Sequence, residues 1–135
     1  VRGNYKETDP LLPSNNYGWS KLGGECAVHM YKNSLILRLN MTEKPWIHKY
    51  AFKNIKSNFL YHDEVIKILP YLFSHNGIIN IGSNNSSILK FAKRTNKSVK
   101  GKNYKINKNE PIMPKNSTLN TNKLKKILKK KFNFI

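Results

Sequence analysis

Two short, almost uninterrupted apolar runs constrain the fold of this chain more than any other feature. Residues 34–39 read Ser-Leu-Ile-Leu-Arg-Leu, and residues 77–81 read Gly-Ile-Ile-Asn-Ile. A strand buried on both faces shows such a run, whereas a strand with one face in water alternates apolar and polar residues. The two runs therefore predict strands of a parallel sheet, whose faces must be covered by helices.

Segments with helical spacing flank and separate the two runs. In residues 16–32, apolar and small side chains recur at steps of three and four, which predicts a helix with Ser14 as its N-cap. Because helices and strands alternate along the chain, we expect an α/β fold. The other helices are expected from a cap at Asp63 to about residue 75 with a kink at Pro70, after Ser86 or Ser87, and across residues 118–131.

The chain as a whole, residues 1–135, is expected to form a single partial domain. Its remaining segments have weak helical or strand periodicity. Residues 1–13 predict a loop that leads into the first helix, since they contain glycine and proline. We expect a loop with a short helix at residues 40–58, a small strand at residues 59–60 and an irregular segment at residues 96–117.

The formal charge of +18 would ordinarily suggest nucleic acid or an anionic membrane as a partner. Almost all of the excess is lysine, spread along a chain that is also rich in asparagine and isoleucine, which is what an AT-rich coding sequence produces. Arginine, which suits bidentate contacts to phosphates and bases, occurs only at Arg2, Arg38 and Arg94. We therefore expect no nucleic-acid partner.

The apolar runs are far shorter than the roughly 20 residues that span a bilayer, and the chain does not open on a signal-like segment. Its single cysteine, Cys26, cannot form an internal disulfide and is expected to be a buried small apolar residue. These features predict a cytoplasmic protein without a membrane partner.

Tyr17 and Lys21 are the residues with the clearest chemical meaning. They lie four positions apart, so both side chains emerge on one face of the same predicted helix. A free phenol, with a pKa near 10, donates a proton reluctantly at neutral pH, but an adjacent ammonium stabilises the phenolate. The pair could therefore protonate a carbonyl oxygen, although a tyrosine and a lysine at this spacing also occur by chance in many helices.

The residues around the pair make it more specific. The string Gly3-Asn-Tyr-Lys-Glu-Thr-Asp-Pro10, then Pro13, then Tyr17-Gly-Trp-Ser-Lys-Leu-Gly-Gly-Glu25 resembles the extended short-chain dehydrogenases and reductases that act on nucleotide sugars. The likeness continues through residues 35–38, 59–65, 77–82 and 87–92. Within that family it is closest to the dTDP-4-dehydrorhamnose reductase group, including the closing stretch at residues 116–124.

The resemblance implies the C-terminal part of a Rossmann-type extended short-chain dehydrogenase fold. It also implies reduction of a nucleoside-diphosphate 4-keto-6-deoxy sugar, with NADPH or NADH as the hydride donor. Tyr17 would be the general acid, and Lys21 would assist it and bind the cofactor ribose. The loop after the predicted strand at residues 34–39 would contact cofactor and substrate. Arg38 would contact the substrate, Asn40 both, and Met41 the cofactor. Glu25, Glu7 and Asp9 are expected to have structural roles.

The family's N-terminal dinucleotide-binding half has no counterpart in this sequence. Its glycine-rich turn binds the cofactor pyrophosphate at a helix N-terminus, and the glycine spacing in residues 82–86 does not match that turn. The isolated chain is therefore expected to be inactive, with its catalytic face completed by a missing N-terminal half or by a homodimer partner.

Two other functions stay open. One is a non-catalytic binding module, since a regulatory subunit that resembles these reductases binds methionine adenosyltransferase. The other is a basic nucleic-acid-binding protein. No metal site is expected, because none of the histidines has a partner at ligand spacing, and the aromatic residues are expected in the core. The histidines are His29, His48, His62 and His75, and the aromatic residues are Trp46, Phe52, Phe59, Tyr61, Tyr71 and Phe73.

Overall fold

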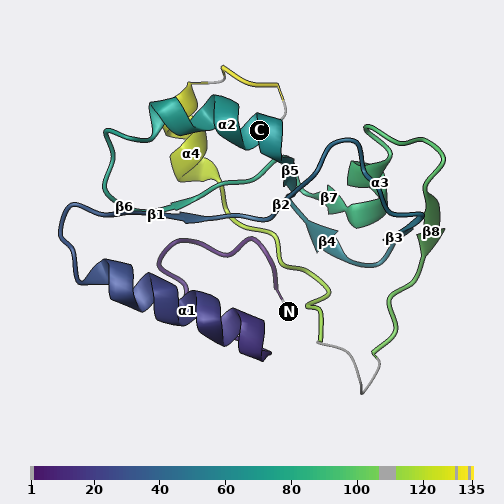
Figure 1. The fold of residues 1–135 in the computed structure, drawn as a ribbon, viewed down its shortest axis with the longest axis horizontal. Helices are drawn as coiled ribbons and strands as arrows, with labels where there is room; N and C mark the ends of the chain where they lie inside the picture. Colours follow the sequence, from purple (N-terminus) through teal and green to yellow (C-terminus); the bar gives the residue numbers. More distant parts are fainter. Residues whose placement is uncertain (1, 107–111, 130, 134) are drawn as a thin grey trace.

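The structure, a computed structural model, describes residues 2–106, 112–129, 131–133 and 135. Helices and strands are interspersed along the chain without strict alternation, and the strands of these described residues form four separate two-stranded ladders (Figure 1). The elements are α1 (Asn16–His29), β1 (Leu35–Arg38), β2 (Met41–Thr42), β3 (Tyr50–Phe52), β4 (Lys56–Ser57), β5 (Leu60–Tyr61), α2 (His62–Ile68), the 3-10 helix η1 (Leu69–Tyr71), β6 (Gly77–Asn80), β7 (Ser86–Ser87), α3 (Ile88–Ala92), β8 (Lys100–Lys102) and α4 (Asn122–Leu128).

The two apolar runs form the parallel ladder β1–β6, which confirms the prediction made from them. Leu35 pairs with Gly77, and the register continues to Arg38 beside Asn80 at the carboxyl ends of both strands. Helices α2 and α4 lie on one face of this ladder and α1 lies on the other (Figure 1). The arrangement follows from the sequence, because strands this apolar need cover on both faces.

A cluster of buried apolar side chains fills the space between β6, α2 and α4. Its members come from these three elements and their flanks, and several have no exposed surface. On the α1 side of the ladder, by contrast, no residue of the helix is buried. The buried members of the cluster are Leu60, Val65, Ile68, Leu72, Ile79, Ile81, Leu124 and Leu128.

A second buried cluster surrounds α3 and the parallel ladder β3–β8. Phe91 lies at its centre, with its ring centroid 4.5 Å from that of Tyr61 and 6.5 Å from that of Trp46. The short antiparallel ladder β4–β7 precedes α3, and the Ser87 hydroxyl caps this helix by accepting from the Lys90 amide at 3.2 Å. Ser87, one of the two predicted caps, is thus confirmed.

Several expectations about local structure are wrong. The N-cap of α1 is Asn15 and not Ser14, since the Asn15 side chain accepts from the Gly18 amide at 2.8 Å. Asp63 lies in the first turn of α2 and does not cap it. Instead, the Glu64 carboxylate accepts from the Tyr61 amide at 2.8 Å. Pro70 ends α2 before η1 where a kink was expected, because proline has no amide hydrogen to continue the helix.

Two segments for which no strand was predicted also contain strands. Residues 40–58 form β2, β3 and β4 and no helix, and residues 96–117 contain β8, with residues 107–111 lying outside the described part. Phe73 and Tyr71 are exposed where core positions were expected, whereas Trp46 and Tyr61 are buried as predicted. None of the helices in the described ranges has the length and apolar character needed to cross a bilayer.

Candidate active site and a neighbouring pocket

Helix α1 carries the predicted catalytic pair. It runs opposite to β1, so its N-terminal end lies on the side of the molecule where β1 ends (Figure 1). This end begins at a well-formed cap, where Asn15 binds the amides of Gly18 and Trp19 through its side chain and carbonyl. In open α/β folds, ligands bind outside the carboxyl ends of parallel strands. The pair therefore lies at the end of the fold where a ligand is expected.

Tyr17 and Lys21 lie side by side on α1. The Lys21 ammonium is 5.3 Å from the centroid of the Tyr17 ring, and 71% of the Tyr17 surface is exposed. The phenol is thus open to a reacting group, and the Lys21 cation lies beside its ring. Proton transfer to a carbonyl oxygen is chemistry that this arrangement can perform.

Arg38 does not face open solvent, because Glu25 and Glu7 engage its guanidinium. Its Nε and Nη2 donate to the two Glu25 carboxylate oxygens at 3.0 and 2.5 Å, and its Nη1 donates to the Glu7 carbonyl at 3.1 Å. The hydrogen bond from Arg38 lowers the pKa of the Glu25 carboxyl below its usual value, with a smaller contribution from His29. The expected structural role of Glu25 is thus an ion pair with β1, while substrate contact by Arg38 stays a prediction.

Asn40 and Met41 follow β1 directly. The Asn40 side-chain amide donates to the Ser57 hydroxyl at 3.0 Å, and the Asn40 backbone carbonyl accepts from the Leu60 amide at 3.0 Å. Asn40 thus ties the end of β1 to β4 and β5. Met41 lies in β2, and more than half of its surface is exposed. The cofactor and substrate contacts expected of these two residues stay predictions.

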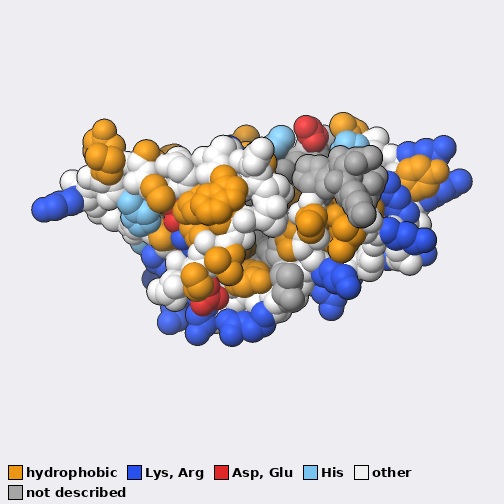
Figure 2. Space-filling view, turned by 90° about the horizontal axis from the view of Figure 1, so that it is seen from below, with side chains coloured by type: hydrophobic (Ala, Val, Ile, Leu, Met, Phe, Trp, Pro, Cys, Tyr) orange, Lys and Arg blue, Asp and Glu red, His pale blue; other side chains and the backbone are white. Residues whose placement is uncertain are grey.

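The surface around α1 is unusually apolar. Seen from the α1 side, hydrophobic side chains lie exposed across the face, while lysine and arginine side chains gather at its ends and along one edge (Figure 2). The exposed side chains on or next to α1 include Leu12, Tyr17, Trp19, Met30 and Tyr31. Cys26, expected to be buried, is also exposed on this helix, because α1 buries no residue at all.

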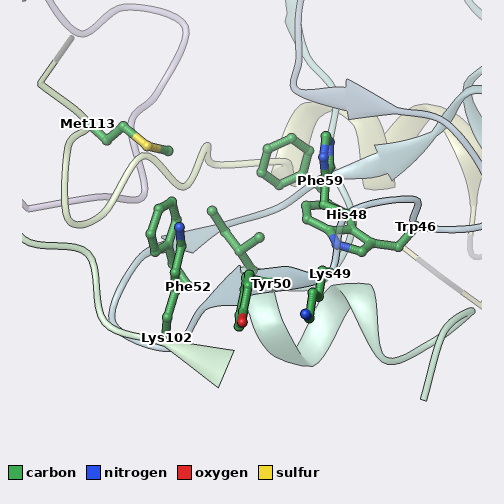
Figure 3. A pocket seen from close by; sticks show the side chains of 10 residues that line it. Trp46, His48, Lys49, Tyr50, Phe52, Phe59, Lys102 and Met113 are labelled. Atoms are coloured by element: carbon green, nitrogen blue, oxygen red, sulfur yellow. The ribbon is translucent and has the colours of Figure 1, made fainter. Parts of the chain in front are cut away.

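A cavity of about 460 Å³ opens beside β3. Trp46, Tyr50, Phe52 and Phe59 form aromatic walls, and the cationic side chains of the wall come from β8 and from the residues before β3 (Figure 3). The Lys102 ammonium lies 5.1 Å from the Phe52 ring centroid and 5.7 Å from that of Tyr50. The remaining lining residues are His48, Lys49, Ala51, Ile88 and Met113.

The pocket combines flat apolar walls with positive charge, which suits a ligand with a planar ring and an anionic group. This pocket was not predicted from the sequence, because the aromatic residues were expected in the core. The density of aromatic residues between positions 46 and 61, together with Lys49, was a signal for it. Lys102 could not have been assigned, since it reaches the pocket only through the pairing of β8 with β3.

Metal-binding residues do not cluster in the part of the chain that the structure describes. No group of three or more histidine, cysteine, aspartate or glutamate side chains there is placed to hold an ion. His48 packs on Trp46 with ring centroids 5.3 Å apart, and His29 lies 3.7 Å from the Glu25 carboxylate.

Comparison with solved structures gives a match over nearly the whole chain. The crystal structure of a hypothetical dTDP-4-dehydrorhamnose reductase from Sulfolobus tokodaii superimposes with a TM-score of 0.79 over 98% of this chain, at 24% sequence identity. The two proteins share a fold. This confirms, at the level of the fold, the resemblance seen in the sequence. The chain spans about half of the Sulfolobus reductase, since the match covers 55% of that protein. No protein-family model and no curated protein sequence matches the chain.

Two residues predicted to contact a dinucleotide cofactor, Tyr17 and Lys21, are exposed on α1. Tyr17 and Lys21 could hold the ribose next to the nicotinamide, since a phenol and an ammonium can both donate to its hydroxyls. Gly82 offers no room for a pyrophosphate, because a Cβ built there would already lie 2.4 Å from the Asn58 amide nitrogen. A phosphate-binding loop would therefore have to come from another segment or chain.

Proposed function

We propose that this chain is the part of an NAD(P)H-dependent reductase that carries the general acid and the substrate pocket. The complete enzyme would reduce the 4-keto group of a nucleoside-diphosphate 4-keto-6-deoxy sugar. The observation that carries the proposal is the exposed Tyr17–Lys21 pair on a chain with the fold of a hypothetical dTDP-4-dehydrorhamnose reductase. The expected cofactor, NADPH or NADH, and a cytoplasmic location are part of this proposal.

Reduction of a ketone to an alcohol adds a hydride to the carbonyl carbon and a proton to the carbonyl oxygen. The nicotinamide cofactor supplies the hydride when it is bound. The Tyr17 hydroxyl donates the proton to the carbonyl oxygen, and the resulting phenolate is stabilised by the Lys21 ammonium beside it. Lys21 also orients the cofactor ribose by hydrogen bonding.

The aromatic pocket can bind the nucleotide part of this substrate. A nucleobase can stack on Tyr50 or Phe52, and the Lys49 and Lys102 ammonium groups can attract the diphosphate. The cavity of about 460 Å³ lies within the usual size range of small-molecule sites. The pocket needs no residue of α1, so base binding and proton transfer are assigned to separate parts of the chain.

A second candidate, a non-catalytic module that binds a nucleotide sugar, is favoured by that same independence. The pocket is built from residues 46–113 alone, so it would hold a ligand even where α1 performs no chemistry. Ligand binding without turnover in the completed protein would support this alternative.

The catalytic proposal is tested on the chain together with its dinucleotide-binding half, as the full-length protein. Loss of NADPH absorbance is followed with a dTDP-linked 4-keto-6-deoxy sugar as the substrate. Tyr17→Phe should lower kcat by about 10² to 10⁴ and leave cofactor binding nearly unchanged, because only the proton donor is removed. Tyr31→Phe, at an exposed tyrosine just after α1, is the matched control and should keep full activity.

Unchanged turnover in Tyr17→Phe would show that Tyr17 is not the proton donor. The pocket is tested separately by titrating dTDP into a Trp19→Phe variant, in which Trp46 is the remaining tryptophan, and following its fluorescence. Lys102→Gln should weaken binding about tenfold, since a charge-assisted contact is lost, whereas Lys105→Gln, at an exposed lysine outside the pocket, should not. The same titration with DNA at low salt tests the expected absence of a nucleic-acid partner.

A further inference from the structure

Helix α1 is attached to the rest of the molecule without a buried side chain. None of its residues, Asn16 to His29, is buried, and only Gly18, Leu22 and Glu25 are half-buried. A helix of a globular protein ordinarily docks through an apolar stripe, as α2 does here with Val65 and Ile68. The position of α1 must therefore depend on its polar contacts.

The strongest polar contact of α1 is the ion pair between Glu25 and Arg38. Both carboxylate oxygens accept from the guanidinium, in the two-bond geometry that fixes orientation as well as distance. The side chains are shielded from water, with 12% of the Glu25 and 15% of the Arg38 side chain exposed. A shielded pair of this kind is weakened by solvent and salt far less than a surface pair.

Arg38 is in turn anchored to the leading segment and, through it, to the neighbouring strand. Its Nη1 donates to the Glu7 carbonyl at 3.1 Å, and the Glu7 carboxylate accepts from the Asn80 amide at 3.1 Å. Arg38 and Asn80 are register partners at the carboxyl end of β1–β6. The Asn80 side chain also donates to the Tyr5 carbonyl at 2.9 Å. These four residues, Glu7, Glu25, Arg38 and Asn80, are called the polar clamp below.

The clamp acts on the side of α1 that bears the proposed catalytic pair. Tyr17, Lys21 and Glu25 are spaced four residues apart, so they follow one another along the same side of the helix. A rotation or lift of α1 at Glu25 therefore displaces Tyr17 and Lys21 as well, because a helix of this length moves as a rigid rod.

We propose that Glu25 and Arg38 are positioning residues, whose two-bond ion pair docks α1 on the carboxyl end of β1–β6 and so places Tyr17 and Lys21. The role of the placed pair rests on the proposed function, whereas the docking itself does not. Without the ion pair, α1 separates from the ladder. An undocked helix of 14 residues is only marginally stable in water, so its hydrogen bonds open more often and its amides exchange faster.

Hydrogen–deuterium exchange of the full chain tests the docking without any activity assay. Glu25→Gln, which keeps the side-chain volume, should raise exchange in residues 18–29 about tenfold and leave exchange in α3 and β3 unchanged. Arg38→Lys, which keeps the charge but loses the two-bond geometry, should have the same local effect. The exchanged pair, Glu25→Arg with Arg38→Glu, should restore part of the protection, because the ion pair is rebuilt but the bond to the Glu7 carbonyl is not.

Asp63→Asn is the matched control, since it removes a carboxylate from the exposed Lys44–Asp63 pair and should leave α1 exchange unchanged. Unchanged α1 exchange in both Glu25→Gln and Arg38→Lys would overturn the proposal, as would a uniform increase across the chain or no recovery in the exchanged pair. In the full-length enzyme, Glu25→Gln should lower kcat with little change in KM. If turnover is absent even without substitutions, the proposed function fails while the exchange result still decides the docking.

Discussion

The two faces of the β1–β6 ladder are covered by helices that are attached in different ways. On one face, α2 and α4 bury a cluster that includes Ile68, Leu72 and Leu124, none of which has exposed surface. On the other face, no residue of α1 is fully buried, and the Glu25–Arg38 pair joins the helix to β1. The first face is covered by a fully buried core. The second face carries the candidate catalytic pair on a helix whose apolar surface is still exposed.

The difference separates stability from function within one small α/β unit. Burial of apolar area on the α2 and α4 face supplies most of the free energy of folding around the ladder. An ion pair supplies orientation more than stability, because desolvation of the charges offsets much of their attraction. Substitutions on the two faces should therefore have effects of different kind and size.

The largest effect is expected from truncation of a leucine on the face covered by α2 and α4. Leu72→Ala should lower the free energy of unfolding by about 2 to 5 kcal/mol, because it leaves a cavity in the buried cluster. Leu22→Ala on the half-buried side of α1 should cost about 1 kcal/mol or less. Urea unfolding measures both, and equal losses in the two variants would remove the contrast between the faces.

An intermediate effect is expected on acidification. The folded-state pKa of Glu25 is lowered, chiefly by the hydrogen bond from Arg38, so its contribution to docking is fully present above the usual value of 4.5 and is lost as pH falls below it. Amide chemical shifts of α1 should therefore change in this acid range before those around Leu72 do. Glu25→Gln should abolish the α1 transition, and its persistence in that variant would assign it to another group.

The smallest effect is expected at a glycine on the outer side of α1. Gly23→Ala should raise the free energy of unfolding by about 0.5 to 1 kcal/mol, because alanine favours the helix and a Cβ there meets nothing within 4 Å among the described atoms. Gly18→Ala should gain less, since its Cβ would lie 3.1 Å from the Pro13 Cβ. Thermal unfolding compares them, and a destabilised Gly23→Ala variant would show that this side of α1 already has a packing partner in solution.

The sequence predicted the elements whose identity depends on their own residues. The runs at residues 34–39 and 77–81 became β1 and β6, and the helical spacing after Asn15 became α1. It missed β3 and β8, because a strand such as Lys100-Gly-Lys102 has no apolar pattern and exists only through its pairing with residues 50–52. The cap of α2 was missed for a similar reason, since Glu64 closes it from within the first turn.

The candidate site likewise contains some contacts that follow from the local sequence and others that only the fold creates. The adjacency of Tyr17 and Lys21 was determined by the sequence alone, because four-residue spacing places two side chains together on any helix. Only the tertiary structure decided that Arg38 binds Glu25 and Glu7 and that Lys102 completes an aromatic pocket. These contacts join residues far apart in the chain, and a local pattern carries no information about which distant segment the fold brings beside it.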